Sequence, residues 1–195
     1  EPDQPSSCSI GANTCINKGV YEGFVNLPLN FNGYHVVYER CCRNGSITNI
    51  VAPGATGANY WAFIPNVNDV GFANTSAVFK ELPPNFLCTN TALKFDHSAT
   101  DADGDSLVYS LVTPYLGADQ NNPRPNNGNQ GFLEKPPFTQ LKWKNSYTYD
   151  DPIDGNPKMN IDPETGFLTL TPTRVGQFVV GISVKEYRNG KLLEV

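Results

Sequence analysis

Apolar and polar residues alternate along several short stretches of the chain, and turn-forming residues separate these stretches. In residues 34–41, Tyr34, Val36 and Tyr38 fall on one face of a period-two pattern. Residues 178–184 alternate in the same way. Further short apolar runs predict strands at 20–29, 47–51, 60–64, 78–79, 93–95, 107–112, 138–143, 167–171 and 191–195.

A helical period of 3.6 residues is not sustained over three turns anywhere in the chain. The 17 glycines and 16 prolines also favour short strands joined by turns. We therefore predict an all-β fold of two Ig-like or cadherin-like β-sandwich domains. The boundary is expected between Asn74 and Pro84, giving domains at 1–80 and 81–195. Because the last strand stops in mid-pattern, we expect the second domain to continue beyond residue 195.

The composition excludes some classes of function. Of the 195 residues, 39% are hydrophobic, which is enough to bury a core. The formal net charge is −5 and no basic stripe is present, so the sequence does not favour nucleic-acid binding. No apolar run is long enough to cross a bilayer, and we expect no membrane insertion.

Five cysteines are candidates for disulfide bonds, and they favour an oxidising compartment. No C-x-x-C pair is present, and neither histidine has zinc-ligand spacing to a cysteine, which disfavours zinc. A small loop closed by the first two cysteines is one plausible bond. The adjacent pair should point to opposite faces of a strand and so find different partners. An odd count leaves one thiol free or paired beyond the sequence. The cysteines are Cys8, Cys15, Cys41, Cys42 and Cys88.

Three carboxylates at alternate positions, Asp101, Asp103 and Asp105, suggest a cation site. Oxygen ligands at this density suit Ca²⁺, which would also relieve the repulsion between the like charges. An EF-hand loop has glycine at its sixth position and glutamate at its twelfth. Counted from Asp101 as the first position, this loop has Gly104 at the fourth and Val112 at the twelfth, so it is not an EF-hand. The alternative is a solvated polar turn.

Two motifs in the second half resemble those of cadherin-like and bacterial Ig-like modules. Residues 96–111 resemble an "A-T-D-x-D-G-D-x-L-x-Y-S-L" signature, and residues 161–172 resemble a "D-x-x-T-G-x-L-x-x-T-P" stretch. The resemblance implies that Asp101, Asp103 and Asp105 bind Ca²⁺ at a domain junction. It also implies further ligands from the preceding Asn/Asp-rich stretch, for which Asn74 and Asp69 are the candidates.

The first half carries a resemblance of its own. Residues 38–50, residues 73–79 and Cys88 are similar to large surface proteins of Bacteroidota, including gliding-motility adhesins exported by the type IX secretion system. The resemblance implies a secreted protein at the cell surface. Its expected partners are other domains or subunits of a surface filament.

Catalysis has little support in the sequence. With two histidines and no nucleophile–base pair in a recognisable context, we expect no enzyme. Tyr147 and Tyr149 lie close to two aspartates and are candidates for ligand binding at the surface. The leading hypothesis is thus a structural or adhesive surface module stiffened by Ca²⁺. The alternative is a carbohydrate-binding module of a secreted polysaccharide-degrading protein, with surface polysaccharide as its partner.

Overall fold

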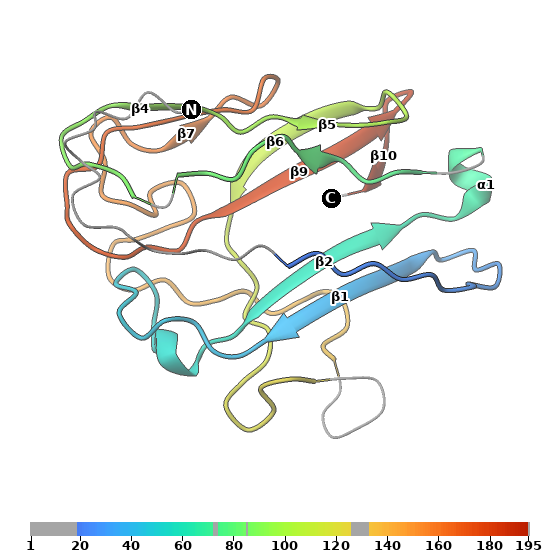
Figure 1. Cartoon of the computed structure of the whole chain (residues 1–195), viewed down its shortest axis with the longest axis horizontal. Coiled ribbons are helices and arrows are strands. Elements are labelled where there is room, and N and C mark those ends of the chain that lie inside the picture. The colour runs from blue at the N-terminus through green and yellow to red at the C-terminus, as the bar shows by residue number, and fades with distance from the viewer. Residues whose placement is uncertain (1–18, 72–73, 85, 126–132, 195) are drawn as a thin grey trace.

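The computed structural model describes residues 19–71, 74–84, 86–125 and 133–194. Within these ranges the chain is all-β, made of short antiparallel sheets with almost no helix (Figure 1). The strands are β1 (Tyr34–Arg40), β2 (Ala58–Ile64), β3 (Val78–Phe79), β4 (Leu93–Asp96), β5 (Ala99–Thr100), β6 (Ser106–Val112), β7 (Asn160–Ile161), β8 (Phe167–Leu170), β9 (Gly181–Arg188) and β10 (Lys191–Glu194). A 3-10 turn, η2 (Pro53–Ala55), and one short helix, α1 (Val67–Val70), complete the described elements.

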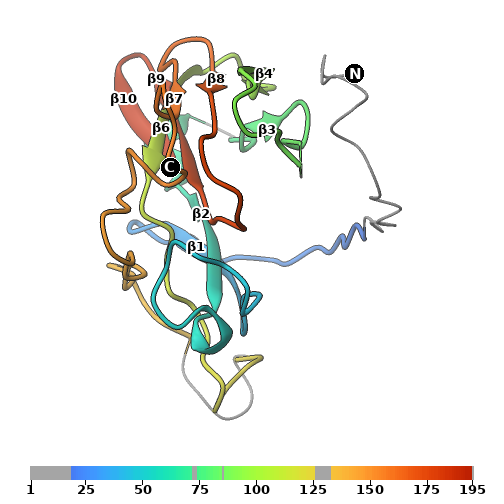
Figure 2. The same cartoon turned by 90° about the vertical axis from the view of Figure 1, so that its left-hand side faces the viewer.

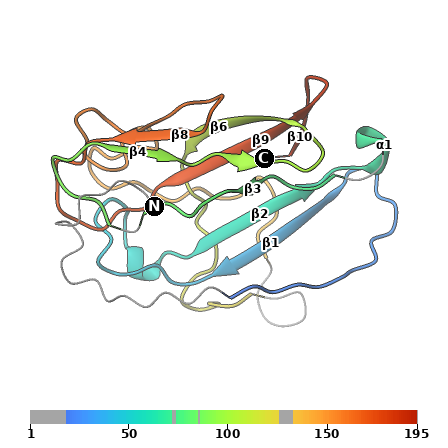
Figure 3. The ribbon, with the colours of Figure 1, turned by 45° about the horizontal axis from the view of Figure 1, so that its top comes forward.

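Each sheet is small and antiparallel. One three-stranded sheet has the order β10-β9-β6 and another has the order β4-β8-β7. The strands β3 and β5 pair with each other, as do β1 and β2. Figure 1 shows the long β1–β2 ribbon below the other sheets, and Figure 3 shows the ribbon from a tilted direction.

The main core lies between the two three-stranded sheets. Alternate residues of β4 and β8, such as Phe95 and Leu168, point to the same side and are buried. Tyr109 of β6 is buried in the same cluster, and Ile182 and Val184 of β9 pack against it. The two sheets therefore face each other across one apolar cluster.

A second, smaller cluster joins residues that are far apart in the sequence. Ile50, Leu141 and Val179 are buried together, and Trp143 packs against them. An isolated bridge pairs Ile50 with Trp143. These contacts join residues before residue 80 to residues after it. The division of the chain into two domains at residue 80 stays a prediction.

Three of the predicted strands are not strands in the structure. Residues 20–29 have no regular structure, and residues 47–51 and 138–143 contribute only isolated bridges. The Asn-Gly turn at residues 44–45 predicts that 47–51 returns along residues 34–41 as a hairpin, but β1 pairs with β2 over its whole length. Burial explains the difference, because Ile50 enters the second cluster instead of lying beside β1.

Candidate metal centre

The loop between β5 and β6 curls around one carboxylate. The Oδ1 atom of Asp101 accepts hydrogen bonds from the backbone N–H groups of Asp103, at 3.0 Å, and Asp105, at 2.9 Å. Gly104 has a φ of +79°, a conformation that favours glycine. The Asp/Gly sequence therefore bends the backbone so that all three carboxylates gather on one side.

The three carboxylates each offer an oxygen, and these oxygens all lie within 4.8 Å of one another. The Oδ2 atom of Asp101 is buried and has no hydrogen-bond partner among the described residues. A buried carboxylate oxygen without a partner is costly, and a bound cation would satisfy it. Oxygen-only donors of this kind suit a hard cation such as Ca²⁺.

Arg188, from the end of β9, lies against the same cluster. Its Nε and Nη2 atoms donate to the two carboxylate oxygens of Asp105 at 2.8 and 2.7 Å, which is a bidentate ion pair. Its Nη2 atom also lies 3.6 Å from Asp103. The hydrogen bond to Asp105 raises the pKa of Arg188. A bound cation would thus share the Asp105 carboxylate with the Arg188 guanidinium. The Asp101 carboxylate receives no hydrogen bond from Arg188.

The segment that precedes β3 is joined to the cluster as well. Arg188 donates from Nη1 to the carbonyl of Val70 at 2.9 Å and from Nη2 to the Oδ1 atom of Asn74 at 3.0 Å. The backbone N–H of Thr75 donates to Asp103 at 2.6 Å. Asn74, a predicted further ligand, therefore lies beside the aspartates. The other, Asp69, belongs to α1, and its side chain is outside what the structure describes.

A fourth carboxylate strengthens the negative charge of this region. Glu186 of β9 is 2% exposed, and it accepts hydrogen bonds from Nδ2 of Asn74, at 3.0 Å, and from the backbone N–H of Ala77. The region thus holds four carboxylates, at Asp101, Asp103, Asp105 and Glu186, and Arg188 forms ion pairs with Asp103 and Asp105. Negative charge in excess of one guanidinium is what a divalent cation would neutralise.

Sequence reasoning missed Arg188 and Glu186. They lie 83 and 81 residues after Asp105 in the chain, and the pairing of β6 with β9 brings them back, with Leu107 opposite Glu186. No spacing rule links residues so far apart. The only available signal was the alternating pattern that predicted β9, which did not fix the pairing partner.

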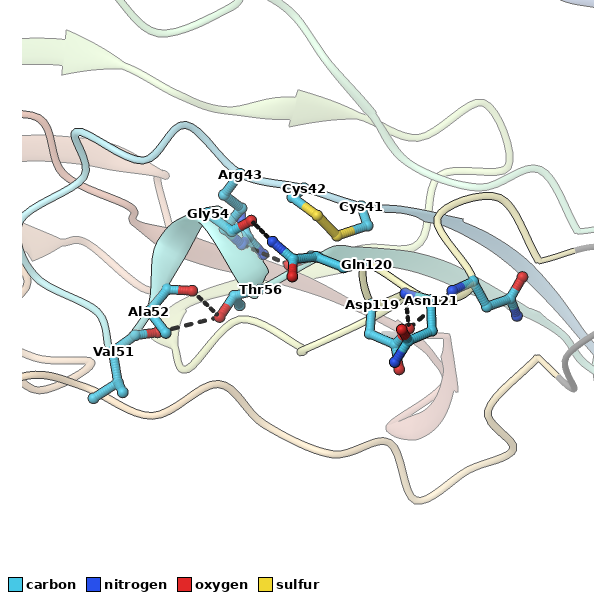
Figure 4. Close-up of a disulfide and its surroundings, with 12 residues drawn as sticks. Cys41, Cys42, Arg43, Val51, Ala52, Gly54, Thr56, Asp119, Gln120 and Asn121 are labelled. Atoms are coloured by element: carbon cyan, nitrogen blue, oxygen red, sulfur yellow. Dashed lines mark hydrogen bonds between the residues drawn. A yellow bond between two sulfur atoms is a disulfide. The ribbon is translucent and has the colours of Figure 1, made fainter.

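The cysteine predictions need one correction. Cys41 and Cys42 are bonded to each other, with their Cα atoms 3.0 Å apart across a cis peptide (Figure 4). The prediction of two different partners was wrong, because β1 ends at Arg40 and the alternation of a strand no longer applies to the pair. Cys88 is also disulfide-bonded. The predicted loop between Cys8 and Cys15 lies outside the described residues.

Polar contacts surround the Cys41–Cys42 disulfide (Figure 4). Arg43 donates from Nε to the carbonyl of Gly57 at 2.7 Å and from Nη2 to that of Tyr115 at 3.2 Å. Gln120 donates to the carbonyl of Gly54 at 3.0 Å. These bonds tie the turn after β1 to residues 115–120.

The two tyrosines proposed for ligand binding have different surroundings. Tyr147 is buried, and its hydroxyl donates to Asp154 at 2.9 Å, so its ring is not presented to solvent. Burial raises the pKa of its hydroxyl. Tyr149 is 52% exposed. Of the two tyrosines on which the carbohydrate-binding alternative rests, only Tyr149 is therefore exposed at the surface.

His97 serves a packing role at the edge of the main core. It is 6% exposed and stacks on Phe79, with ring centroids 4.4 Å apart. Burial lowers its pKa. The other histidine, His35, packs between Trp61 and Phe63 of β2. Both imidazoles contact aromatic rings.

Comparison with protein-family models, with curated proteins and with solved structures finds no match for this chain. Among the described residues, no helix has the length and apolar character that a membrane span requires.

Proposed function

We propose that this chain is a structural or adhesive module of a larger adhesin or filament, secreted to the cell surface, in which Ca²⁺ stiffens a domain junction. The observation that carries the proposal is the buried, partnerless Oδ2 atom of Asp101 within a cluster of carboxylates. Asp101, Asp103 and Asp105 would hold the cation, and Asn74 lies close by.

The position of the cluster supports a role in stiffness. Residues 70–75 connect the part of the chain that carries β1 and β2 to the part that carries β3 to β10. Val70, Asn74 and Thr75 are already tied to Arg188 and Asp103 by hydrogen bonds. A cation bound to the β5–β6 loop would lock this connector against the loop and against β9. Stiffness is a property that a surface filament needs.

The finer fold belongs to the same proposal. Two three-stranded antiparallel sheets that face each other across an apolar core support a cadherin-like or Ig-like sandwich in the second half. For the first half, an Ig-like sandwich rests on the sequence pattern. Placement outside the cell is supported by the Cys41–Cys42 bond and the bonded Cys88, since disulfides persist in oxidising compartments. The Bacteroidota lineage and type IX export rest on the sequence resemblance.

Thermal unfolding with Ca²⁺ and with chelator tests the cation site. At a Ca²⁺ concentration about 100 times Kd, binding to the folded state should raise Tm by about 5–10 °C for a chain of this size. Asp101→Asn should abolish most of the shift. Asp162→Asn is the matched control, because Asp162 organises a similar turn by accepting N–H bonds from Glu164 and Thr165 but lies outside the cluster. An equal Tm in Ca²⁺ and chelator, or an unchanged shift in Asp101→Asn, would contradict the proposal.

A further inference from the structure

A cavity of about 1080 Å³ opens into the main core between the two three-stranded sheets. Leu93 of β4 and Leu168 of β8 line it from one sheet, and Ile182 of β9 lines it from the other. Leu93 and Leu168 are buried members of the core, so the cavity reaches between the sheets and is not a hollow of the outer surface. A volume of this size suits a small-molecule site, which is typically apolar with a few polar groups.

The segment that borders the cavity on the β4 side is held in place. Residues 86–89 and Thr91 line the cavity, and Figure 2 shows the chain around β3 on the same side of the sandwich as β4. Cys88 is disulfide-bonded, and the N–H of Asn90 donates to the carbonyl of Pro172, another lining residue, at 2.7 Å. The cavity therefore has walls that are fixed before any ligand binds.

His97 contributes a hydrogen-bond acceptor without a partner. Its ring lines the cavity and is 6% exposed, and its Nδ1 atom has no hydrogen-bond partner among the described residues. Burial lowers the pKa of His97, so the ring is neutral at pH 7 and has one donor and one acceptor nitrogen. A hydrogen bond to the backbone of Glu81, which opposes this effect on the pKa, uses the donor. Nδ1 is thus a buried acceptor that lacks a donor, which is costly.

The rest of the wall restricts what could bind there. Of the described residues that line the cavity, Arg174 is the only one with a charge at neutral pH, and it is already paired with Asp154 at 3.0 Å. The wall thus favours an uncharged ligand. A peptide would bring many backbone N–H and C=O groups between two apolar sheet faces, where they would lack partners. A small molecule with a single donor matches the single free acceptor.

We propose that this cavity binds an uncharged, apolar small molecule that carries a hydroxyl group, and that this hydroxyl donates to Nδ1 of His97. The apolar body of the ligand packs between the two sheets, against Leu168 and Ile182. A ligand site of this kind goes beyond the proposed structural function, and it uses none of the residues of the acidic cluster.

Fluorescence titration of the whole chain with a matched pair of probes tests the site. 1-Hydroxypyrene and pyrene share one apolar ring system, and only the first has a hydroxyl donor. The wild type should bind 1-hydroxypyrene about tenfold or more tighter than pyrene, because only that probe satisfies the buried acceptor. His97→Phe keeps an aromatic ring beside Phe79 but removes the acceptor. It should bind the two probes with affinities within about twofold of each other.

A second variant tests the location without changing His97. Thr91→Trp places a large side chain in the cavity and should weaken the binding of both probes about tenfold or more. Thr169→Trp is the matched control and should bind both as the wild type does. Thr169 lies between the buried residues Leu168 and Leu170 of β8, so its side chain points to the outer face of the sheet.

Three results would overturn the proposal. The first is a wild type that binds neither probe, and the second is a wild type that binds both equally well. The third is a preference for 1-hydroxypyrene that persists in His97→Phe or binding that is unchanged in Thr91→Trp, since either would place the probes elsewhere on the molecule.

Discussion

At the scale of single residues, Asn49 joins the two halves of the chain. Its side chain is fully buried, and Nδ2 donates to the carbonyls of Pro152 and Val179 at 2.9 and 2.8 Å. Its Oδ1 accepts the N–H of Val179 at 3.0 Å. Both N–H donors and the carbonyl oxygen of the amide are thus bonded to backbone groups more than 100 residues away, next to the smaller apolar cluster.

We predict that Asn49→Ala lowers the free energy of unfolding by about 2–4 kcal/mol, because it leaves three buried backbone groups without partners. Urea unfolding followed by circular dichroism measures the effect. Asn160→Ala, at an exposed position in β7, is the control and should change the free energy by less than about 0.5 kcal/mol. Equal stability of the two variants would show that the amide does not stabilise the fold.

The sequence could predict part of the candidate site at this scale. Alternate spacing within one short loop brought Asp101, Asp103 and Asp105 together, and the structure places their oxygens within 4.8 Å of one another. Asn49 could not be found, because a buried asparagine and a surface asparagine look the same in a sequence. Arg188 was missed for a different reason, since only strand pairing brings it to the loop.

At the scale of elements, the hydrophobic pattern predicted strands well where a partner strand pairs along the element. The pattern located β1, β2, β6 and β8 to within a few residues. It failed at residues 20–29, which are apolar but have no partner strand among the described residues. Hydrophobic pattern reports the tendency to be buried in a sheet, whereas a strand also needs a neighbour to satisfy its hydrogen bonds.

A close approach of two backbones fixes how β2 sits beside residues 115–118. Gly117 has a φ of +69°, and a Cβ there would overlap the carbonyl of Ala58 and lie 2.7 Å from the nitrogen of Asn59. An isolated bridge between Asn59 and Tyr115 forms at the same place. Only glycine fits both the conformation and the space.

We predict that Gly117→Ala destabilises the protein by about 2–5 kcal/mol, since it adds steric overlap to conformational strain. Gly190→Ala is the control: its φ is +79°, but a Cβ there would meet nothing within 4 Å. That variant should lose only about 1–2 kcal/mol, the cost of the left-handed conformation alone. Thermal unfolding of both variants gives the comparison, and equal losses would mean that the close approach is unimportant.

At the scale of the whole molecule, three distant segments meet at one acidic cluster. The connector around Asn74, the β5–β6 loop and the end of β9 are joined there by Arg188 and by backbone N–H groups. The all-β class could be predicted from the turn-rich, alternating sequence. The meeting of these segments could not, because it depends on which strands pair.

Hydrogen exchange with and without Ca²⁺ tests the central claim most directly, because it shows where a cation acts. Binding at Asp101, Asp103 and Asp105 should slow exchange in residues 74–79, 101–107 and 185–190 about tenfold or more, while β1 and β2 serve as the internal reference and change little. Unchanged exchange in all three segments at millimolar Ca²⁺, or slowing confined to other parts of the chain, would contradict a calcium clamp at this junction.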